Sequence, residues 1–93
     1  MSKADLMEAY AKFNEKHEFY PGQIVEWKRG MAHKRPDGPF VVLEVLAEPV
    51  LDPRQDAGLT YFREPLDIVL GHFDDDDGAF VQYYYDSRRF QPV

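Results

Sequence analysis

The sequence contains no cysteine, which excludes a disulfide scaffold, a cysteine nucleophile, a thiolate zinc site and an iron–sulfur cluster. It has no apolar run near the ~20 residues that a membrane-spanning helix needs. Residues 1–5 lack the apolar stretch of a secretory signal peptide. A chain of 93 residues is long enough for one small hydrophobic core. We therefore expect a cytoplasmic protein of one domain that does not interact with membranes.

Residue patterns that carry catalysis are also missing. Serine occurs only at Ser2 and Ser87 and threonine only at Thr60, and none of them lies in a nucleophile-elbow motif. The three histidines are far apart in the sequence and form no HExxH motif. The six glycines are scattered singly, so there is no phosphate-binding loop. We expect no enzymatic activity, no cofactor and no metal site.

The strongest local charge feature is the acidic run Asp74–Asp77, which is followed by Gly78. An EF-hand aligned on this glycine would have Phe73 and Tyr84 at its first and last ligand positions, so the run is not an EF-hand. Two interpretations remain, a weak divalent-cation site and a solvated hairpin tip. We favour the hairpin tip, because an Asp-Gly pair between apolar segments is a strong hairpin signal.

The N-terminal segment has the pattern of an amphipathic helix. Ser2 is a suitable N-cap and Asp5 completes an approximate capping box. The pattern predicts about four turns, and Pro21 terminates them. The apolar stripe, which we expect to pack on the rest of the protein, consists of Leu6, Tyr10, Phe13 and His17.

After residue 22 the hydrophobic period changes from that of a helix to that of strands. Strands are predicted over 24–28, 40–46, 66–71 and 79–85, followed by one helical turn within 86–92, with loops over 29–39 and 48–64. So few residues must curl into one shared core. We therefore predict a mainly β (α+β) fold, namely a small SH3-like antiparallel barrel over 19–93 with the N-terminal helix of 1–18 packed against it.

Several segments resemble known barrels. Residues 19–25, FYPGQIV, look like the start of the first strand in SH3-like barrels, including KOW and Tudor-like modules. Residues 78–82 with 86–92 are similar to their last strand and closing turn. Residues 64–71 and 86–90 resemble a group of small bacterial proteins without assigned activity. The resemblance implies the barrel fold over 19–93 and leaves the function open.

Aromatic residues are the one abundant class, at 15% of the chain. We assign Phe40, Phe80, Phe90 and the helix stripe to the core. The consecutive residues 83–85 are all tyrosine and cannot all face inward, because neighbours on a strand point to opposite faces. We therefore predict a protein-binding module with an exposed aromatic surface. Its predicted residues are Trp27, Tyr83, Tyr84 and Tyr85, with Arg35 and Arg88 as polar contacts.

Two alternatives use other features of the chain. The first is an RNA- or ribosome-associated module, in which Lys28, Arg29, Lys34 and Arg35 join Arg88 and Arg89 in one basic patch. The net charge of −6 opposes nucleic-acid binding. A structural interpretation is also available, in which Arg88 or Arg89 pairs with Asp67, Asp86 or Glu64 and holds the terminal turn. The second alternative is a non-catalytic accessory subunit of an enzyme.

Overall fold

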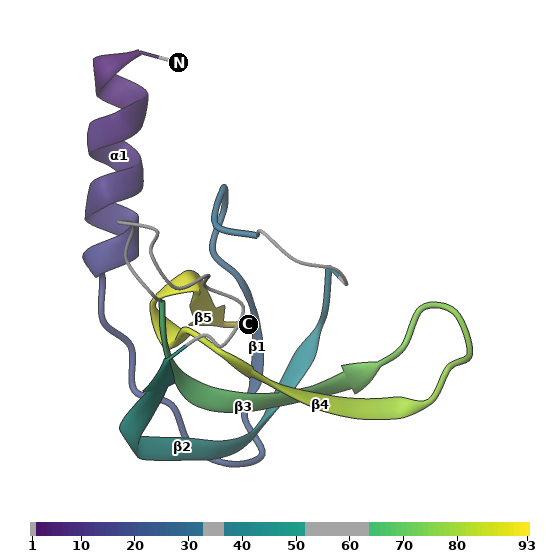
Figure 1. The fold of residues 1–93 in the computed structure, drawn as a ribbon. Coiled ribbons are helices and arrows are strands. Elements are labelled where there is room, and N and C mark those ends of the chain that lie inside the picture. Colours follow the sequence, from purple (N-terminus) through teal and green to yellow (C-terminus); the bar gives the residue numbers. More distant parts are fainter. Residues whose placement is uncertain (1, 33–36, 52–63) are drawn as a thin grey trace, which may run out of the picture.

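The computed structural model describes residues 2–32, 37–51 and 64–93, and it shows one helix projecting from a curved sheet (Figure 1). The elements are α1 (Lys3–Asn14), β1 (Ile24–Trp27), β2 (Phe40–Leu51), β3 (Pro65–Phe73), β4 (Phe80–Tyr85), the 3-10 turn η1 (Ser87–Arg89) and β5 (Phe90–Pro92). The predicted mainly β fold with an N-terminal helix is confirmed. The helical turn expected within 86–92 is η1, and β5 follows it directly.

The sheet is antiparallel throughout, with strand order β4-β3-β2-β1-β5. The second strand pairs with β1 on one side and β3 on the other, and its register with β3 shifts twice, between Val42 and Glu44 and between Val45 and Val50. Such irregularities bend a strand and increase its twist. In the described residues no pairing joins β4 to β5, so backbone hydrogen bonds do not close this sheet into a barrel.

The core lies on one face of the sheet. Along β3 the buried side chains alternate, with Ile68 and Leu70 at its centre and His72 at its end. Phe40 and Phe90 are also buried, as predicted. The prediction for Phe80 is wrong, because its ring lies on the opposite face and is 54% exposed. We call that opposite face of the sheet the outer face.

The N-terminal helix begins at the predicted residue, but its apolar stripe does not pack on the sheet along its whole length. Ser2 and Asp5 form the capping box. The helix ends at Asn14, before His17, so the prediction that it continues until Pro21 terminates it is wrong. None of its residues is buried, and Leu6 and Tyr10 are more than 60% exposed. The predicted packing of this stripe on the sheet is therefore wrong for its first half. No helix in the described residues has the length and apolar character needed to span a membrane.

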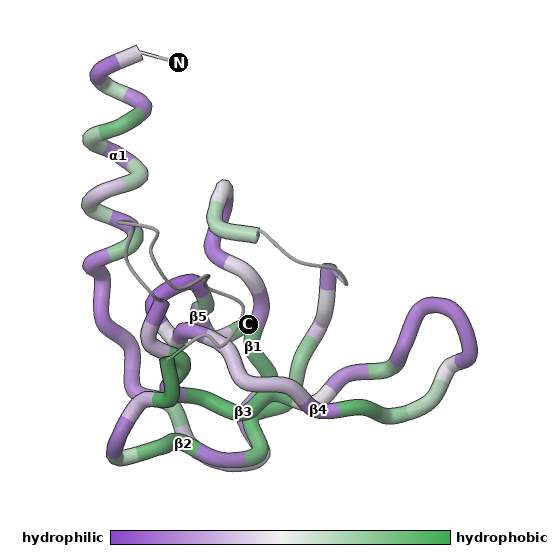
Figure 2. Tube along the Cα trace, in the orientation of Figure 1, coloured by the Kyte–Doolittle hydropathy of each residue, from purple (hydrophilic) through white to green (hydrophobic). Residues whose placement is uncertain are grey.

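The helix is held at its C-terminal end. The buried ammonium of Lys28 donates hydrogen bonds to the carbonyl oxygens of Lys12 and Glu15. The guanidinium of Arg88 lies 4.4 Å from the centre of the Phe13 ring. A cation next to the last carbonyls of a helix is favourable. Hydrophilic and hydrophobic residues alternate along α1, which stands away from the sheet over most of its length (Figure 2).

Candidate functional site

The tyrosine triplet divides between the two faces of β4. Tyr85 belongs to the core and is 2% exposed, whereas Tyr83 and Tyr84 are 54% and 49% exposed. Tyr84 points to the outer face, and Tyr83 shares the face of Tyr85 but lies nearer the hairpin tip, where less covers it. The prediction that Tyr85 contributes to an exposed surface is therefore wrong. Strand alternation separates neighbours but does not say where the core ends.

The exposed ring of Tyr83 rests on a buried histidine. It stacks on the His72 ring with 5.8 Å between centroids and an interplanar angle of 26°. The Tyr85 hydroxyl lies 3.3 Å from Nε2 of His72, and the Phe40 ring meets the imidazole edge-on at 5.2 Å. Burial raises the pKa of Tyr85 to about 12. The contacts with Tyr85 and Phe40 hold the His72 ring in place, and the His72 ring in turn supports the ring of Tyr83.

A second group of exposed rings lies on the outer face at the base of the hairpin. Phe73 and Phe80 are opposite each other in the β3–β4 register, with ring centroids 5.8 Å apart, and are 70% and 54% exposed. Phe80 lies over Gly71, where an added Cβ would come within 2.4 Å of the ring. The lack of a side chain at Gly71 thus lets the Phe80 ring lie against the sheet.

These rings border an apolar groove of about 360 Å³, which also includes Ile24 and Pro39. Ile24 is 49% exposed and reaches the groove because it pairs with Val41, which in turn pairs with Gly71. We define the outer patch as Ile24, Phe73, Phe80 and Tyr84. Sequence reasoning missed Ile24 and Phe73. The alternation of Leu66, Ile68 and Leu70 in the sequence, continued beyond the predicted strand, would have placed Phe73 on the opposite face.

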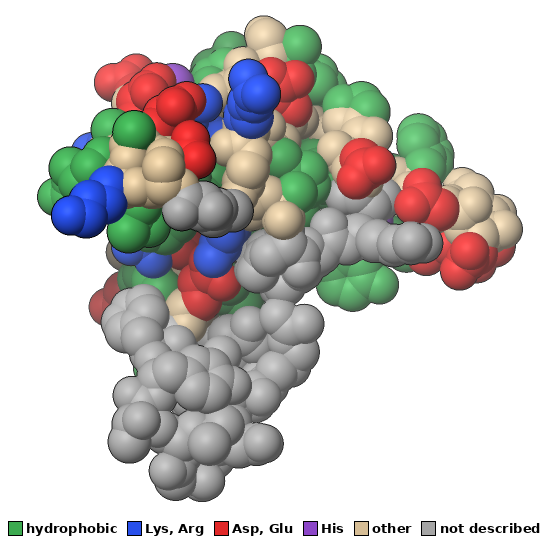
Figure 3. Space-filling model, turned by 90° about the horizontal axis from the view of Figure 1, so that it is seen from above, with side chains coloured by type: hydrophobic (Ala, Val, Ile, Leu, Met, Phe, Trp, Pro, Cys, Tyr) green, Lys and Arg blue, Asp and Glu red, His purple; other side chains and the backbone are tan. Residues whose placement is uncertain are grey.

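The groove has an acidic rim. Asp75 lines it, and the remaining aspartates of the run form the adjacent tip of the hairpin. Seen from above, acidic and apolar side chains lie together on the protruding hairpin (Figure 3). The groove therefore offers apolar contact beside negative charge.

The acidic run itself forms a compact turn. Oδ1 of Asp74 accepts a hydrogen bond from the Asp76 amide, and Oδ1 of Asp77 accepts one from the Ala79 amide. The predicted hairpin between β3 and β4 is confirmed. Within the described part of the chain, no three side chains of the metal-ligating types are placed to hold a metal ion.

The other predicted binding residues do not join Tyr83 and Tyr84. Trp27 packs on the core and stacks on Phe90 with 4.3 Å between centroids. Arg35 lies outside the described residues. The Arg88 side chain folds back onto the buried carboxylate of Asp86, with Nη2 at 2.6 Å from Oδ2. Of the six predicted binding residues, Tyr83 and Tyr84 are thus the two that lie exposed on the β3–β4 hairpin.

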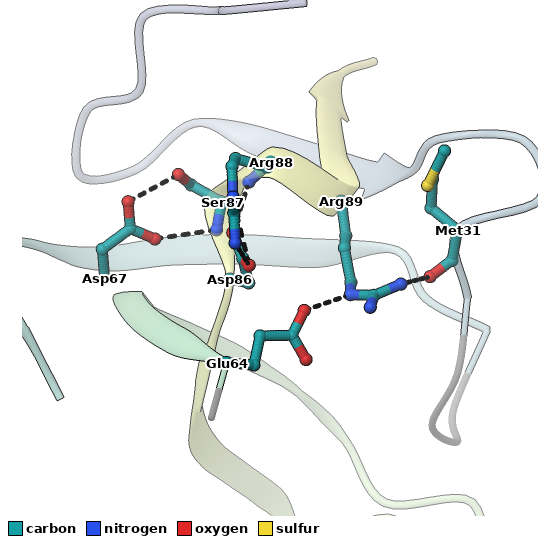
Figure 4. A network of polar contacts seen from close by, with 7 residues as sticks. All are labelled: Met31, Glu64, Asp67, Asp86, Ser87, Arg88 and Arg89. Atoms are coloured by element: carbon teal, nitrogen blue, oxygen red, sulfur yellow. Dashed lines mark hydrogen bonds and ion pairs between the residues drawn. The ribbon is translucent and has the colours of Figure 1, made fainter. Parts of the chain in front are cut away.

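Arg88 and Arg89 hold the terminal turn, as the structural interpretation predicted (Figure 4). The hydrogen bonds from Arg88 to Asp86 raise the pKa of the guanidinium. Arg89 pairs with Glu64 and also donates to the Met31 carbonyl at 3.0 Å. Asp67 completes the network by accepting hydrogen bonds from the amide and hydroxyl of Ser87; these contacts connect η1 with β3 and the loop after β1.

Three of the cations in the basic patch of the RNA-binding alternative are already in contact with other groups of the protein. Lys28 is only 2% exposed, and burial lowers the pKa of its ammonium. Arg88 and Arg89 are paired with carboxylates. Arg29 is exposed, and Lys34 and Arg35 lie outside the described residues. In the described residues, therefore, Lys28, Arg88 and Arg89 serve contacts within the protein, and the part of the predicted patch at Lys34 and Arg35 is not described.

Comparison of the chain with protein-family models, with curated proteins and with solved structures found no match. The class of the protein therefore rests on its own architecture, a small antiparallel sheet with an N-terminal helix. Its most distinctive surface is the β3–β4 hairpin, which carries Tyr83 and, with Ile24 of β1, forms the outer patch.

Proposed function

We propose that this chain is a non-enzymatic protein-binding module that binds through the outer patch, with Tyr83 contributing from the adjoining edge of β4, where it and Tyr84 line one hollow. The observation that carries the proposal is that four large rings on one hairpin, those of Phe73, Phe80, Tyr83 and Tyr84, are each about half exposed or more. Phe73 and Phe80 line the groove, and Tyr83 and Tyr84 line a second hollow beside Glu44 and Val69. Exposed aromatic side chains beside surface hollows are typical anchors of protein interfaces. The proposal keeps Tyr83 and Tyr84 from the sequence prediction and adds Phe73 and Phe80.

The surface favours a partner of defined chemistry. An apolar or aromatic side chain of the partner fits the groove between Ile24 and Phe80, and a Lys or Arg next to it would meet Asp75. The partner is thus a protein segment that combines an apolar anchor with a basic residue.

The strand order also fits the SH3-like barrel that we propose as the finer description of the fold. In such folds, grooves lined by aromatics bind extended peptides.

The RNA-binding alternative has less support. Nucleic-acid binding of this kind depends on several free cations, and Lys28, Arg88 and Arg89 are already engaged by groups of the protein itself. The accessory-subunit alternative is compatible with the proposed surface, because the enzyme would then be the protein partner.

The test is a capture experiment with a matched pair of variants. The immobilised chain, its Phe80→Ser variant and its Tyr10→Ala variant are exposed to a bacterial lysate at low and high salt. Tyr10 is 65% exposed and lies on α1, away from the hairpin, so its variant controls for loss of a solvent-exposed ring. We expect a polypeptide that the parent and Tyr10→Ala retain and Phe80→Ser loses. Direct binding of that polypeptide is then measured with the purified proteins.

Equal retention by all three proteins would contradict the outer patch as the binding surface. Loss of every captured species on nuclease treatment would instead support the RNA alternative. Circular dichroism of Phe80→Ser distinguishes lost binding from lost folding, and we expect a native spectrum because the ring is more than half exposed.

A further inference from the structure

The fourth strand has a free edge in the described structure. All six residues of β4 pair with β3, in an unbroken register from Phe73 opposite Phe80 to Ile68 opposite Tyr85. Within residues 2–32, 37–51 and 64–93, no strand pairs with the other edge of β4. Backbone N–H and C=O groups along such an edge are a template for another strand.

This edge also lacks the features that usually prevent strand association. Residues 80–85, FVQYYY, include no charge, no proline and no glycine, and their pairing with β3 contains no bulge. The opposite end of the sheet is different, because β5 has three residues and includes Pro92. Only one of the two edges is therefore suited to further pairing.

We propose that β4 pairs antiparallel with β4 of a second copy of this chain, with Gln82 opposite Gln82. This register is self-complementary. It places Phe80 opposite Tyr84 on the outer face and Val81 opposite Tyr83 on the other face, and aromatic cross-strand pairs stabilise sheets. The same strand surface serves both copies, as a two-fold symmetric interface requires.

Repulsion between the Asp74–Asp77 runs of the two copies favours the antiparallel over the parallel orientation of the paired β4 strands. A parallel arrangement would place the Asp74–Asp77 runs of both copies side by side. The antiparallel arrangement separates them by the length of β4, about 20 Å, which exceeds the Debye length of ~8 Å at physiological salt. The outer patches of the two copies then form one continuous surface across the two-fold axis.

The first test uses the absence of cysteine from the chain. A Gln82→Cys variant places the two thiols next to each other at the axis, where opposite Cβ atoms lie ~5 Å apart. We expect rapid disulfide-linked dimer formation on mild oxidation. Ala11→Cys, at an exposed position on α1, is the control and should cross-link only slowly. Equal cross-linking of both variants would overturn the proposal.

The second test uses charge at the same position, measured by sedimentation equilibrium of the purified chain. Gln82→Lys and Gln82→Glu each place like charges opposite one another, and we expect each to raise the dimer dissociation constant at least about tenfold. A mixture of the two variants should restore dimerisation as a heterodimer. Lys16→Gln gives the same net charge as Gln82→Glu at an exposed position outside the sheet, and should leave the dissociation constant unchanged.

Two results would overturn the proposal. One is a parent chain that stays monomeric up to millimolar concentration, and the other is a dimer that both charged variants form equally well. Raising the salt concentration should strengthen the dimer, because it screens two chains of net charge −6 from one another. All of these measurements use the chain without a partner, so their failure leaves the proposed protein-binding function untouched.

Discussion

The hydroxyl of Tyr85 lies 3.3 Å from Nε2 of His72, and the two side chains are 2% and 5% exposed. The hydrogen bond gives each of two nearly buried polar groups a partner, which avoids the cost of desolvating them unpaired. It also joins β4 to β3 directly beneath the Tyr83 ring. The exposed hairpin surface therefore depends on a polar contact inside the core.

Removing this hydroxyl should destabilise the protein without changing its shape. In Tyr85→Phe the ring contacts with Phe40, Trp27 and Phe90 remain, but Nε2 of His72 loses the Tyr85 hydroxyl. We expect the free energy of unfolding to fall by about 1–2 kcal/mol, as measured by urea denaturation. A loss below the error of the measurement would mean that the hydrogen bond contributes nothing net.

The stability of the protein should fall at alkaline pH in a way that depends on Tyr85. Its pKa is about 12 in the folded protein and about 10 in an unfolded chain, because burial favours the neutral phenol. The contribution of this group is therefore complete below pH 10 and is lost as the pH rises through 12. The parent should lose about 2 kcal/mol more than Tyr85→Phe between pH 9 and 12. Parallel curves for the two proteins would contradict this assignment.

Gly71 should be coupled energetically to Phe80. In Gly71→Ala the new methyl group would meet the ring, which must turn away from the sheet. We expect a loss of stability of about 1 kcal/mol in the parent background and a clearly smaller loss in the Phe80→Ala background, where only the Leu43 side chain, 3.2 Å from the new Cβ, still crowds the methyl group. Urea denaturation of the four proteins gives the coupling energy. Equal losses in both backgrounds would show that the ring does not limit this position.

Arg88 should act on folding and not on binding. Arg88→Ala leaves the Asp86 carboxylate buried without its cation, which should cost about 2–3 kcal/mol of stability. Lys16→Ala, which removes an exposed cation outside the sheet, should cost less than about 0.5 kcal/mol. Thermal denaturation compares the two. An unchanged melting temperature for Arg88→Ala would contradict the structural role.

Lys28 should control the order of α1 independently of the sheet. Lys28→Met keeps the length of the side chain but removes both hydrogen bonds to the carbonyls of Lys12 and Glu15. Amide exchange in α1 should accelerate about 10- to 100-fold, and exchange in β3 should change little. Lys16→Met is the matched control with an exposed lysine. Equal acceleration in helix and sheet would show that Lys28 supports the whole fold.

Most of the secondary structure followed from patterns in the sequence. The capping pair Ser2 and Asp5, the turn at Gly78 and the apolar run that begins at Phe40 each have a local physical cause, and each appears where it was expected. The length of β2 was underestimated. This strand continues through Pro49 to Leu51 by shifting register, and long-range pairing of that kind leaves no simple periodic signal.

The binding surface was less predictable, because exposure depends on which neighbours a side chain finds. Tyr83 and Tyr85 share one face of β4, yet only Tyr85 reaches the core. Tyr10 has the spacing of a core residue on α1 but is 65% exposed. The hydrophobic period of a sequence predicts which face a side chain is on, but it does not predict how much of that side chain other residues bury.

The pairing of β1 with β5 has a consequence for the order of folding. Glu26 is hydrogen-bonded to Gln91 across a sequence separation of 65 residues, whereas β3 and β4 meet through a short turn. Contacts between distant residues form late, because the entropy of closing a long loop must be overcome first. We therefore expect the β3–β4 hairpin to assemble early and the C-terminal strand to dock beside Trp27 last. Tryptophan fluorescence, which comes from this single indole, would report on that last step directly.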